Sequence, residues 1–337
     1  MWAADMLPPK SNTAFLIAFL LVSDIEFNSA LITGGAGFIG SHLADKLVNE
    51  GIETKVLDNF ATGRKENFSG CIDKQNFSLF NLDLGKLGNR EDYLENVEVV
   101  FHMAADPEVR TGYDKPENSF KQNIVNTFNL LQRIKHSKVK KIVFASSSSV
   151  YGDAKVLPTN EEYGPLCPIS HYGASKLACE AIVSSFCYNY NIEGIILRLA
   201  NVIGSRGRHG LIWDLVHKLK NDKNRLEVLG DGKQTKSFIH ISDAVKGIFQ
   251  SMKKDKDGVE IFNVGSEDGI EIINVAKTVC KNMKLPDIEI FTTGGIENGR
   301  GWKGDIKIAH LDISKLKNLG WQPKLSSLEA ADVTSQE

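Results

Sequence analysis

The sequence predicts an α/β fold in which a mostly parallel, doubly wound sheet is covered by helices on both faces. From residue 28 onward, short β-rich runs alternate with helical patterns, the order that parallel sheets require. Two of these runs, 142–144 and 195–197, are continuously apolar, as expected for strands that are buried on both faces. The expected strands are 30–33, 54–57, 97–102, 141–145 and 194–199, and the expected helices include 39–49, 118–134 and 174–190.

The composition is that of an ordinary globular protein. The chain has 337 residues, of which 42% are hydrophobic and 24% charged, which excludes a disordered chain or a coiled coil. A net charge of -2 argues against a broad basic surface for nucleic acid. The five cysteines are odd in number and include no C-x-x-C pair, so we expect reduced, mostly buried thiols and neither a metal site nor a disulfide framework.

The segment 14–22 (AFLIAFLLV) is continuously apolar but too short to span a membrane, which takes about 20 residues. A signal peptide would also carry a positive n-region and a small-residue cleavage site. Here only Lys10 stands opposite Asp5, and no clear A-x-A site follows. We therefore favour a non-native or upstream-extended start, or a loosely packed terminal helix, over a signal peptide.

Three glycines, Gly34, Gly37 and Gly40, lie between the first expected strand and helix in the segment GGAGFIG. The first permits a tight turn, the second lets the backbone approach a pyrophosphate, and the third allows close helix–strand packing. The N–H groups that follow, including those of Phe38 and Ile39, open a helix whose positive dipole end favours phosphate. The segment therefore predicts a Rossmann-type dinucleotide site, with a purely structural turn as the alternative.

An acidic residue, Asp58, ends the second expected strand 18 residues after the last of these glycines. A carboxylate there accepts the adenosine ribose hydroxyls and repels a 2′-phosphate. Because Asn59 follows it in place of an Arg, NAD is favoured over NADP. Asp83 and Leu84, after a further short strand that follows 54–57, are candidates to bracket the adenine, although Asp83 could instead be a helix N-cap.

The spacing Y-x-x-x-K occurs twice, at Tyr151–Lys155 and at Tyr172–Lys176. Only a helix places residues i and i+4 on one face, and Pro158 marks the first segment as a loop, whereas the second opens a long helical pattern. A free Tyr, with a pKa of about 10, is too weakly acidic to act as a base at neutral pH, but a nearby ammonium and a nicotinamide cation lower that pKa. Tyr172 and Lys176 are thus the candidate base and its partner, and Lys176 could also hold the nicotinamide ribose.

Four serines, 146–149, follow the expected strand 141–145 at the carboxyl edge of the sheet, where ligands bind in open α/β folds. A serine there can hydrogen-bond a reacting hydroxyl, and a simple loop is the alternative. We expect an NAD-binding domain over residues 28–200. A smaller substrate-binding lobe is expected over 201–330, interleaved with the last sheet strands, and 1–27 form an extension outside both.

Taken together, the motifs resemble the extended short-chain dehydrogenase/reductase superfamily, and within it UDP-glucose 4-epimerase and related nucleotide-sugar epimerases. The resemblance covers about residues 28–328. It rests on GGAGFIG at 34–40, the Asp58 strand tip, FHMAA at 101–105, SSSSVYG at 146–152 and YGASK at 172–176, and continues through 198–204, 230–232, 238–240, 311–315 and 319–321.

The resemblance implies a role for individual residues. Ser147 corresponds to the catalytic Ser/Thr, Tyr172 to the base and Lys176 to its partner. The implied cofactor-lining residues are Ala104, Ala105 and Asn123, and the implied substrate contacts are Ser147, Ser148 and Asn201, the last at the sugar-nucleotide phosphate. The resemblance also implies a homodimer paired through helices 118–134 and 174–190.

The serine run separates subclasses of this superfamily. Dehydratases and decarboxylases usually carry acidic residues where this chain has Ser148 and Ser149, so the acid that eliminates water or handles a carboxylate intermediate is missing. Epimerisation needs one base, one hydride acceptor and room for the intermediate to turn. The implied mechanism has Tyr172 take the C4 hydroxyl proton while hydride passes to NAD, after which the 4-keto sugar turns and takes the hydride back on its other face.

Two positions depart from the family pattern at the expected diphosphate contacts, and a third position bears on which sugar fits. Lys236 stands where an Arg often binds the diphosphate, and it keeps the charge but loses the bidentate fork. Trp302 stands where a second Arg often lies, so Arg300 is expected to replace that Arg. Lys236 and Arg300 together predict a local positive pocket, with solvated surface charge as the alternative. Ala309 aligns with a pocket-wall position, and its small side chain predicts that N-acetylated sugars fit.

The predicted function is therefore an NAD-dependent epimerase that inverts C4 of a UDP-hexose, namely UDP-glucose or UDP-galactose and their N-acetylated forms. The alternatives are a nucleotide-sugar reductase or dehydrogenase of the same superfamily and a non-catalytic NAD-binding protein. We expect a cytoplasmic homodimer with no nucleic-acid partner and no stable membrane insertion.

Overall fold

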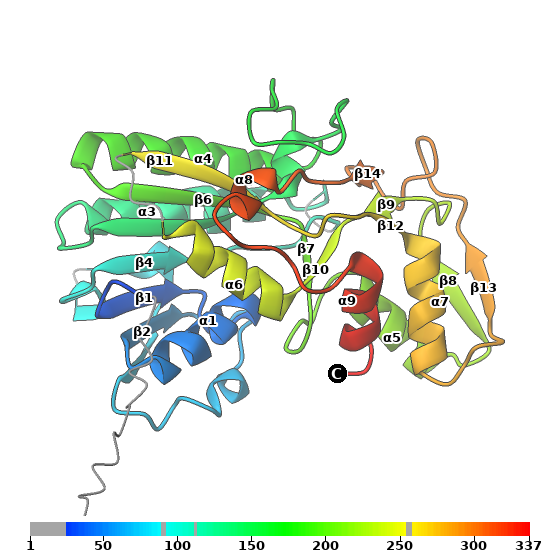
Figure 1. Ribbon diagram of the computed structural model, residues 1–337, viewed down its shortest axis with the longest axis horizontal. Helices are drawn as coiled ribbons and strands as arrows, with labels where there is room; N and C mark the ends of the chain where they lie inside the picture. Colours follow the sequence, from blue (N-terminus) through cyan, green and yellow to red (C-terminus); the bar gives the residue numbers. More distant parts are fainter. Residues whose placement is uncertain (1–24, 89–91, 111–112, 254–257) are drawn as a thin grey trace, which may run out of the picture.

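The main element of the fold is a sheet of seven parallel strands in the order β11-β6-β5-β4-β1-β2-β3, shown in the computed structural model in Figure 1. The model describes residues 25–88, 92–110, 113–253 and 258–337, so the apolar segment 14–22 lies outside the described residues. The predicted doubly wound α/β class is confirmed. The strands are β1 Ser29–Thr33, β2 Glu53–Asp58, β3 Phe77–Asn81, β4 Val99–His102, β5 Lys141–Ser147, β6 Glu193–Leu199 and β11 Val259–Val264.

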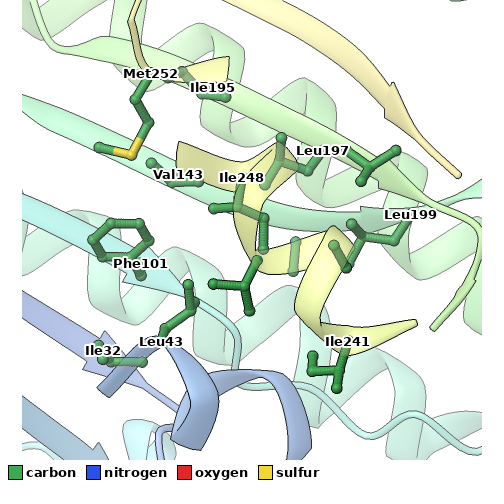
Figure 2. Packing of buried hydrophobic residues seen from close by; sticks show 14 of the residues in the cluster. Ile32, Leu43, Phe101, Val143, Ile195, Leu197, Leu199, Ile241, Ile248 and Met252 are labelled. Atoms are coloured by element: carbon green, nitrogen blue, oxygen red, sulfur yellow. The ribbon is translucent and has the colours of Figure 1, made fainter. Parts of the chain in front are cut away.

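Helices cover both faces of this sheet because neighbouring strand residues point to opposite sides. On one face, α1 (Phe38–Asn49) and α6 (Ile241–Ser251) pack against the sheet, and Figure 2 shows Leu43 and Ile248 against Ile32, Phe101 and Val143. On the other face, α3 (Asn126–Ile134) and α4 (His171–Tyr190) pack against the adjacent residues. Those strand residues are Leu31, Val100 and Ile142. Because their residues are apolar at every position, these strands contribute to a hydrophobic core on each face of the sheet.

Two local predictions need correction. The expected helix 118–134 is divided into α2 (Pro116–Asn118), a π-helical segment η5 (Ser119–Val125) and α3. The segment with Tyr151, expected to be a loop, contains a 3₁₀ turn, η6 (Ser148–Tyr151). Both irregular segments lie beside the serine run or α4, and π-helical segments often occur at functional sites.

The C-terminal third of the chain builds three small sheets to one side of the main one (Figure 1). A core of its own lies between them and the helices α5 (Leu211–Asn221), α7 (Ile272–Asn282) and α9 (Ser327–Thr334). The same third also returns β11 to the main sheet, where it pairs with β6. The small sheets are β7 (Asn201–Ile203) with β10 (Phe238–His240), β9 (Thr235–Lys236) between β12 (Ile270–Glu271) and β14 (Ile308–Ala309), and β8 (Arg225–Val228) with β13 (Glu289–Thr292); the short helix α8 is Ser314–Lys317.

Two sequence expectations can be compared with the described residues directly. Four of the five cysteines are buried and Cys167 is exposed, as expected for mostly buried side chains. Among the described residues, no helix combines the length and apolar character needed to cross a membrane.

A buried histidine, His102, ends β4 between two hydroxyl groups. Its Nδ1 lies 2.6 Å from Thr33 Oγ1, and its Nε2 lies 2.8 Å from Thr127 Oγ1. Burial lowers the pKa of His102 from 6.5 to about 3, and the Lys176 ammonium acts in the same direction. The imidazole is therefore neutral at physiological pH.

This histidine makes stability depend on pH. Below pH 6.5 the unfolded chain binds a proton at His102, whereas the folded chain does not. The contribution of the neutral His102 to the free energy of unfolding is therefore fully present above pH 6.5 and is lost as the pH falls toward about 3. We expect the melting temperature of the wild type to fall more steeply across this window than that of His102→Gln. The exposed His136→Gln is the control; equal slopes for all three proteins would contradict the prediction.

Candidate active site

The glycine turn joins the ends of three strands. Gly34 N donates to Leu57 O at 2.8 Å, and a methyl group added to Gly34 would lie 2.6 Å from backbone atoms of Ala104, in the loop after β4. At Gly40 the added carbon would lie 2.4 Å from Gly34 O. Helix α1 begins at N-cap Gly37, which offers no side-chain cap, and its first turn has no acidic residue. The first N–H groups, those of Phe38 and Ile39, therefore fit a phosphate.

The predicted acidic residue is held directly against this turn. Asp58 Oδ2 accepts from Ala36 N at 2.9 Å and Oδ1 accepts from Phe60 N at 2.7 Å. Burial raises the pKa of Asp58, and the two backbone hydrogen bonds lower it. Each carboxylate oxygen has a second lone pair, so the group can still accept ribose hydroxyls beside the phosphate-binding turn. The residues present thus fit a dinucleotide.

The other cofactor candidates have protein partners that the sequence only partly anticipates. Asn59 Nδ2 donates to Asp83 Oδ2 at 3.2 Å, and Asp83 Oδ1 caps a 3₁₀ turn, η2 (Leu84–Lys86), by accepting from Gly85 N at 2.7 Å. This is the alternative N-cap role foreseen for Asp83. Leu84 is buried in the core under α3, so its side chain packs internally.

Another cofactor candidate, Asn123, lies in η5 and joins that segment to its neighbours. Its Oδ1 accepts from Asp106 N at 2.7 Å, and its Nδ2 donates to Ser175 Oγ at 2.8 Å. The loop after β4, which also contains Ala105, is in this way tied to α4. Asn123 therefore links three segments around the site, namely η5, the loop after β4 and α4.

The predicted catalytic residues meet where β5 ends and α4 begins. Ser147 Oγ accepts from Ser149 N at 3.2 Å and from Ser149 Oγ at 2.9 Å. Because these two donors use both lone pairs of Ser147, its own O–H remains free to donate. The nearby Ser147 side chain lowers the pKa of the Tyr172 phenol. Lys176 Nζ donates to Ala145 O at 2.7 Å and lies 5.8 Å from the centroid of the Tyr172 ring.

The electrostatics of this pair differ from the expectation of a lowered Tyr172 pKa. Burial raises the pKa of Tyr172 to about 12 and outweighs the effect of the Ser147 side chain. Burial also lowers the pKa of Lys176 to about 8, so its charge is held less firmly than that of an exposed lysine. The protein by itself keeps Tyr172 protonated at neutral pH, because desolvation opposes the phenolate.

The predicted substrate residues come together on the small sheets. Lys236 of β9 and Ala309 of β14 are paired in register, and Ser237 N donates to Ala309 O at 3.0 Å. Asn201 Nδ2 donates to Ser237 O at 3.0 Å, which brings it beside the same strands. Ser148 and Ala309 line one small cavity, so η6, which directly follows β5, faces β14.

The two candidate phosphate-binding cations are paired with carboxylates that sequence reasoning missed. Lys236 Nζ lies 2.8 Å from Asp305 Oδ1. Arg300 forms a fork with Asp153 at 3.0 and 2.8 Å and also donates to the carbonyl of Asp305. The positive charge expected in this pocket is therefore neutralised by two carboxylates, those of Asp305 and Asp153. Asp153 directly follows the SSSSVYG segment, which was the available signal.

Arg206, in the loop 204–210, does not join this cluster. Arg206 Nη2 pairs with Asp45 of α1 at 2.6 Å, and His42 Nε2 lies 3.1 Å from Ser205 O. The loop thus rests against the cofactor helix, and Arg206 is committed to it.

Comparison with known proteins gives consistent similarities. Residues 30–265 match the model of the NAD dependent epimerase/dehydratase family. The chain is 34% identical to a putative UDP-glucose 4-epimerase of Methanocaldococcus jannaschii (89% of this chain, 94% of the relative). It is 33% identical to UDP-glucuronic acid decarboxylase 6 of Arabidopsis thaliana (91% and 88%). The crystal structure of a UDP-galactose 4-epimerase superposes with a TM-score of 0.81 at 38% identity, over 91% of this chain and 97% of that one.

Proposed function

The chain belongs to the NAD-dependent epimerase/dehydratase family and takes NAD as its cofactor, and from that premise we propose that it inverts C4 of a UDP-hexose. The single observation that carries the proposal is the contact set of Ser147. Its hydroxyl accepts from Ser149 and keeps its own proton to donate to a substrate oxygen, and the positions that would hold an acid in a decarboxylase or dehydratase are serines.

In the proposed reaction the protein transfers one proton and allows the sugar to turn within the site. Tyr172 Oη takes the proton of the C4 hydroxyl, while Ser147 donates a hydrogen bond to oxygen and Lys176 supplies positive charge. Bound NAD would accept the C4 hydride and add the positive charge that helps to lower the pKa of Tyr172. Ser148 and Ala309 both have small side chains, which supports the proposal that the site accepts N-acetylated sugars as well.

The reaction is tested by incubating purified protein, without added NAD, with UDP-glucose, UDP-galactose, their N-acetylated forms and UDP-glucuronic acid, and separating the products. We expect each neutral sugar to give its C4 epimer, with no net change in bound NAD. Carbon dioxide and a UDP-pentose from UDP-glucuronic acid would instead indicate a decarboxylase. A requirement for stoichiometric cofactor would indicate a reductase or dehydrogenase.

The paired cations predict opposite effects for two substitutions. If Arg300 binds the substrate diphosphate, Asp153 competes for the same guanidinium. Arg300→Gln should raise KM for the UDP-sugar about 10–100-fold, because charged hydrogen bonds of about 1.5–3 kcal/mol are lost, whereas Asp153→Asn should lower KM. The exposed Arg225→Gln, which breaks a surface pair with Asp222, is the matched control. If KM moved in the same direction in Arg300→Gln and Asp153→Asn, Asp153 would not be competing with the substrate for Arg300.

We also propose a homodimer formed through η5, α3 and α4. Three exposed aromatic side chains, Phe120, Phe128 and Tyr190, lie on these elements, and the Phe186 ring contacts the last two at 5.9 and 5.3 Å. Sedimentation analysis at increasing concentration checks this assembly. The free thiols support placing the protein in a reducing compartment, the cytoplasm.

A further inference from the structure

A buried ion pair joins the catalytic helix to the sheet. Arg198 of β6 forms a fork with Glu180 of α4, with Nη2–Oε2 at 2.8 Å and Nε–Oε1 at 3.1 Å, and the two side chains are 3% and 6% exposed. Arg198 Nη1 also donates to the carbonyl of Glu161 at 3.1 Å. Burying two ions costs several kcal/mol each, and apolar residues of similar volume are often as stable. Stability alone therefore does not explain this pair.

The Glu180–Arg198 ion pair is one of several contacts that align α4 with the neighbouring strand β5. Tyr172, Lys176 and Glu180 follow one another at intervals of four residues, so they share one face of α4. Three consecutive residues of β5 meet them. Ala145 O accepts from Lys176 at 2.7 Å and Ser146 Oγ donates to Glu180 Oε1 at 2.5 Å. Ser147, the next residue, lowers the pKa of Tyr172.

We propose that Glu180 and Arg198 are positioning residues for the C4 inversion, because their ion pair locks α4 against β5 and β6 so that Tyr172 and Lys176 meet Ser147. This inference rests on the proposed function. The lock acts through Ser146 and the helix, and needs no contact with sugar or cofactor.

The charge of Glu180 adds a second effect. Burial lowers the pKa of Lys176, and the Glu180 carboxylate four residues away raises it. Cys179 of α4 also raises the pKa of Lys176. His102 of β4, on which Lys176 acts, is neutral. Without Glu180, Lys176 should release its proton at a lower pH.

The test is the double variant Glu180→Leu/Arg198→Met in the NAD-loaded protein, because removing one partner alone would leave an unpaired buried charge and favour unfolding. We expect a folded variant with bound NAD and unchanged KM. Its kcat should fall about 10–100-fold through misplacement of the reacting groups, and the alkaline limb of its pH profile should move to lower pH. Arg198→Lys, which keeps the charge but not the fork, should give an intermediate kcat. Wild-type kcat and pH profile in the double variant would overturn the proposal.

A structural control and a second readout keep the outcome clear. Asp243 is equally buried and accepts from Lys324 N at 2.7 Å, so Asp243→Asn should lose stability but keep kcat. If the wild type inverts no UDP-hexose, the proposed function fails by itself. Positioning is then measured as ionisation of Tyr172, from the ultraviolet titration of NAD-loaded protein minus that of Tyr172→Phe. A higher Tyr172 pKa in the double variant supports the lock, and identical titrations overturn it.

Discussion

Tyr172→Phe is expected to lower kcat about 10²–10⁴-fold, the usual contribution of a positioned acid–base group, and to leave NAD bound. The substitution removes only the hydroxyl that contacts Ser147, and it leaves the ring and the Lys176 contact with Ala145 in place. The measurement is the rate of C4 epimer formation at saturating UDP-sugar, together with the cofactor content of the purified protein.

A second tyrosine on the same helix is the control. Tyr188 of α4 is 82% exposed, so Tyr188→Phe makes the same chemical change away from the site and should keep the wild-type rate. Substantial activity in Tyr172→Phe would rule out Tyr172 as the base. Loss of bound NAD in that variant would mean that the hydroxyl serves cofactor binding more than proton transfer.

Gly40→Ala is expected to abolish NAD retention and activity, and to destabilise the fold by about 1–3 kcal/mol, as overpacking typically does. The added carbon would lie 2.4 Å from Gly34 O and 2.7 Å from Gly35 Cα. Both are backbone atoms of the phosphate-binding turn, so the clash is relieved only by separating α1 from that turn. Cofactor content after purification and the melting temperature measure the two effects.

Gly70→Ala is the matched control, because its nearest neighbour would lie 3.5 Å away, at Asp45 Oδ1, an ordinary contact. It should keep both NAD and stability. If Gly40→Ala keeps its cofactor and melts with the wild type, close packing at this glycine is not needed for the dinucleotide site.

Much of the fold and part of the site follow from short-range patterns. The alternation of apolar runs predicts β1, β2, β4, β5 and β6, because strands buried on both faces need apolar residues at every position. The π-helical η5 is missed because a single residue of extra winding leaves the apolar pattern nearly unchanged. The expected ranges do not include β3 or β11. The last sheet strands are expected to interleave with the C-terminal lobe, but the mixed pattern there does not locate β11.

Within the site, the sequence by itself determines the glycine turn, the strand-tip carboxylate and the Tyr172–Lys176 face. These depend on local geometry, namely a strand–turn–helix unit and one turn of helix. Only the tertiary structure decides how charges are paired. Arg300 meets Asp153 across 147 residues of chain and Lys236 meets Asp305 across 69, and no local pattern encodes those partners. The direction of the Tyr172 pKa is likewise a tertiary property, because desolvation depends on every atom packed around the phenol.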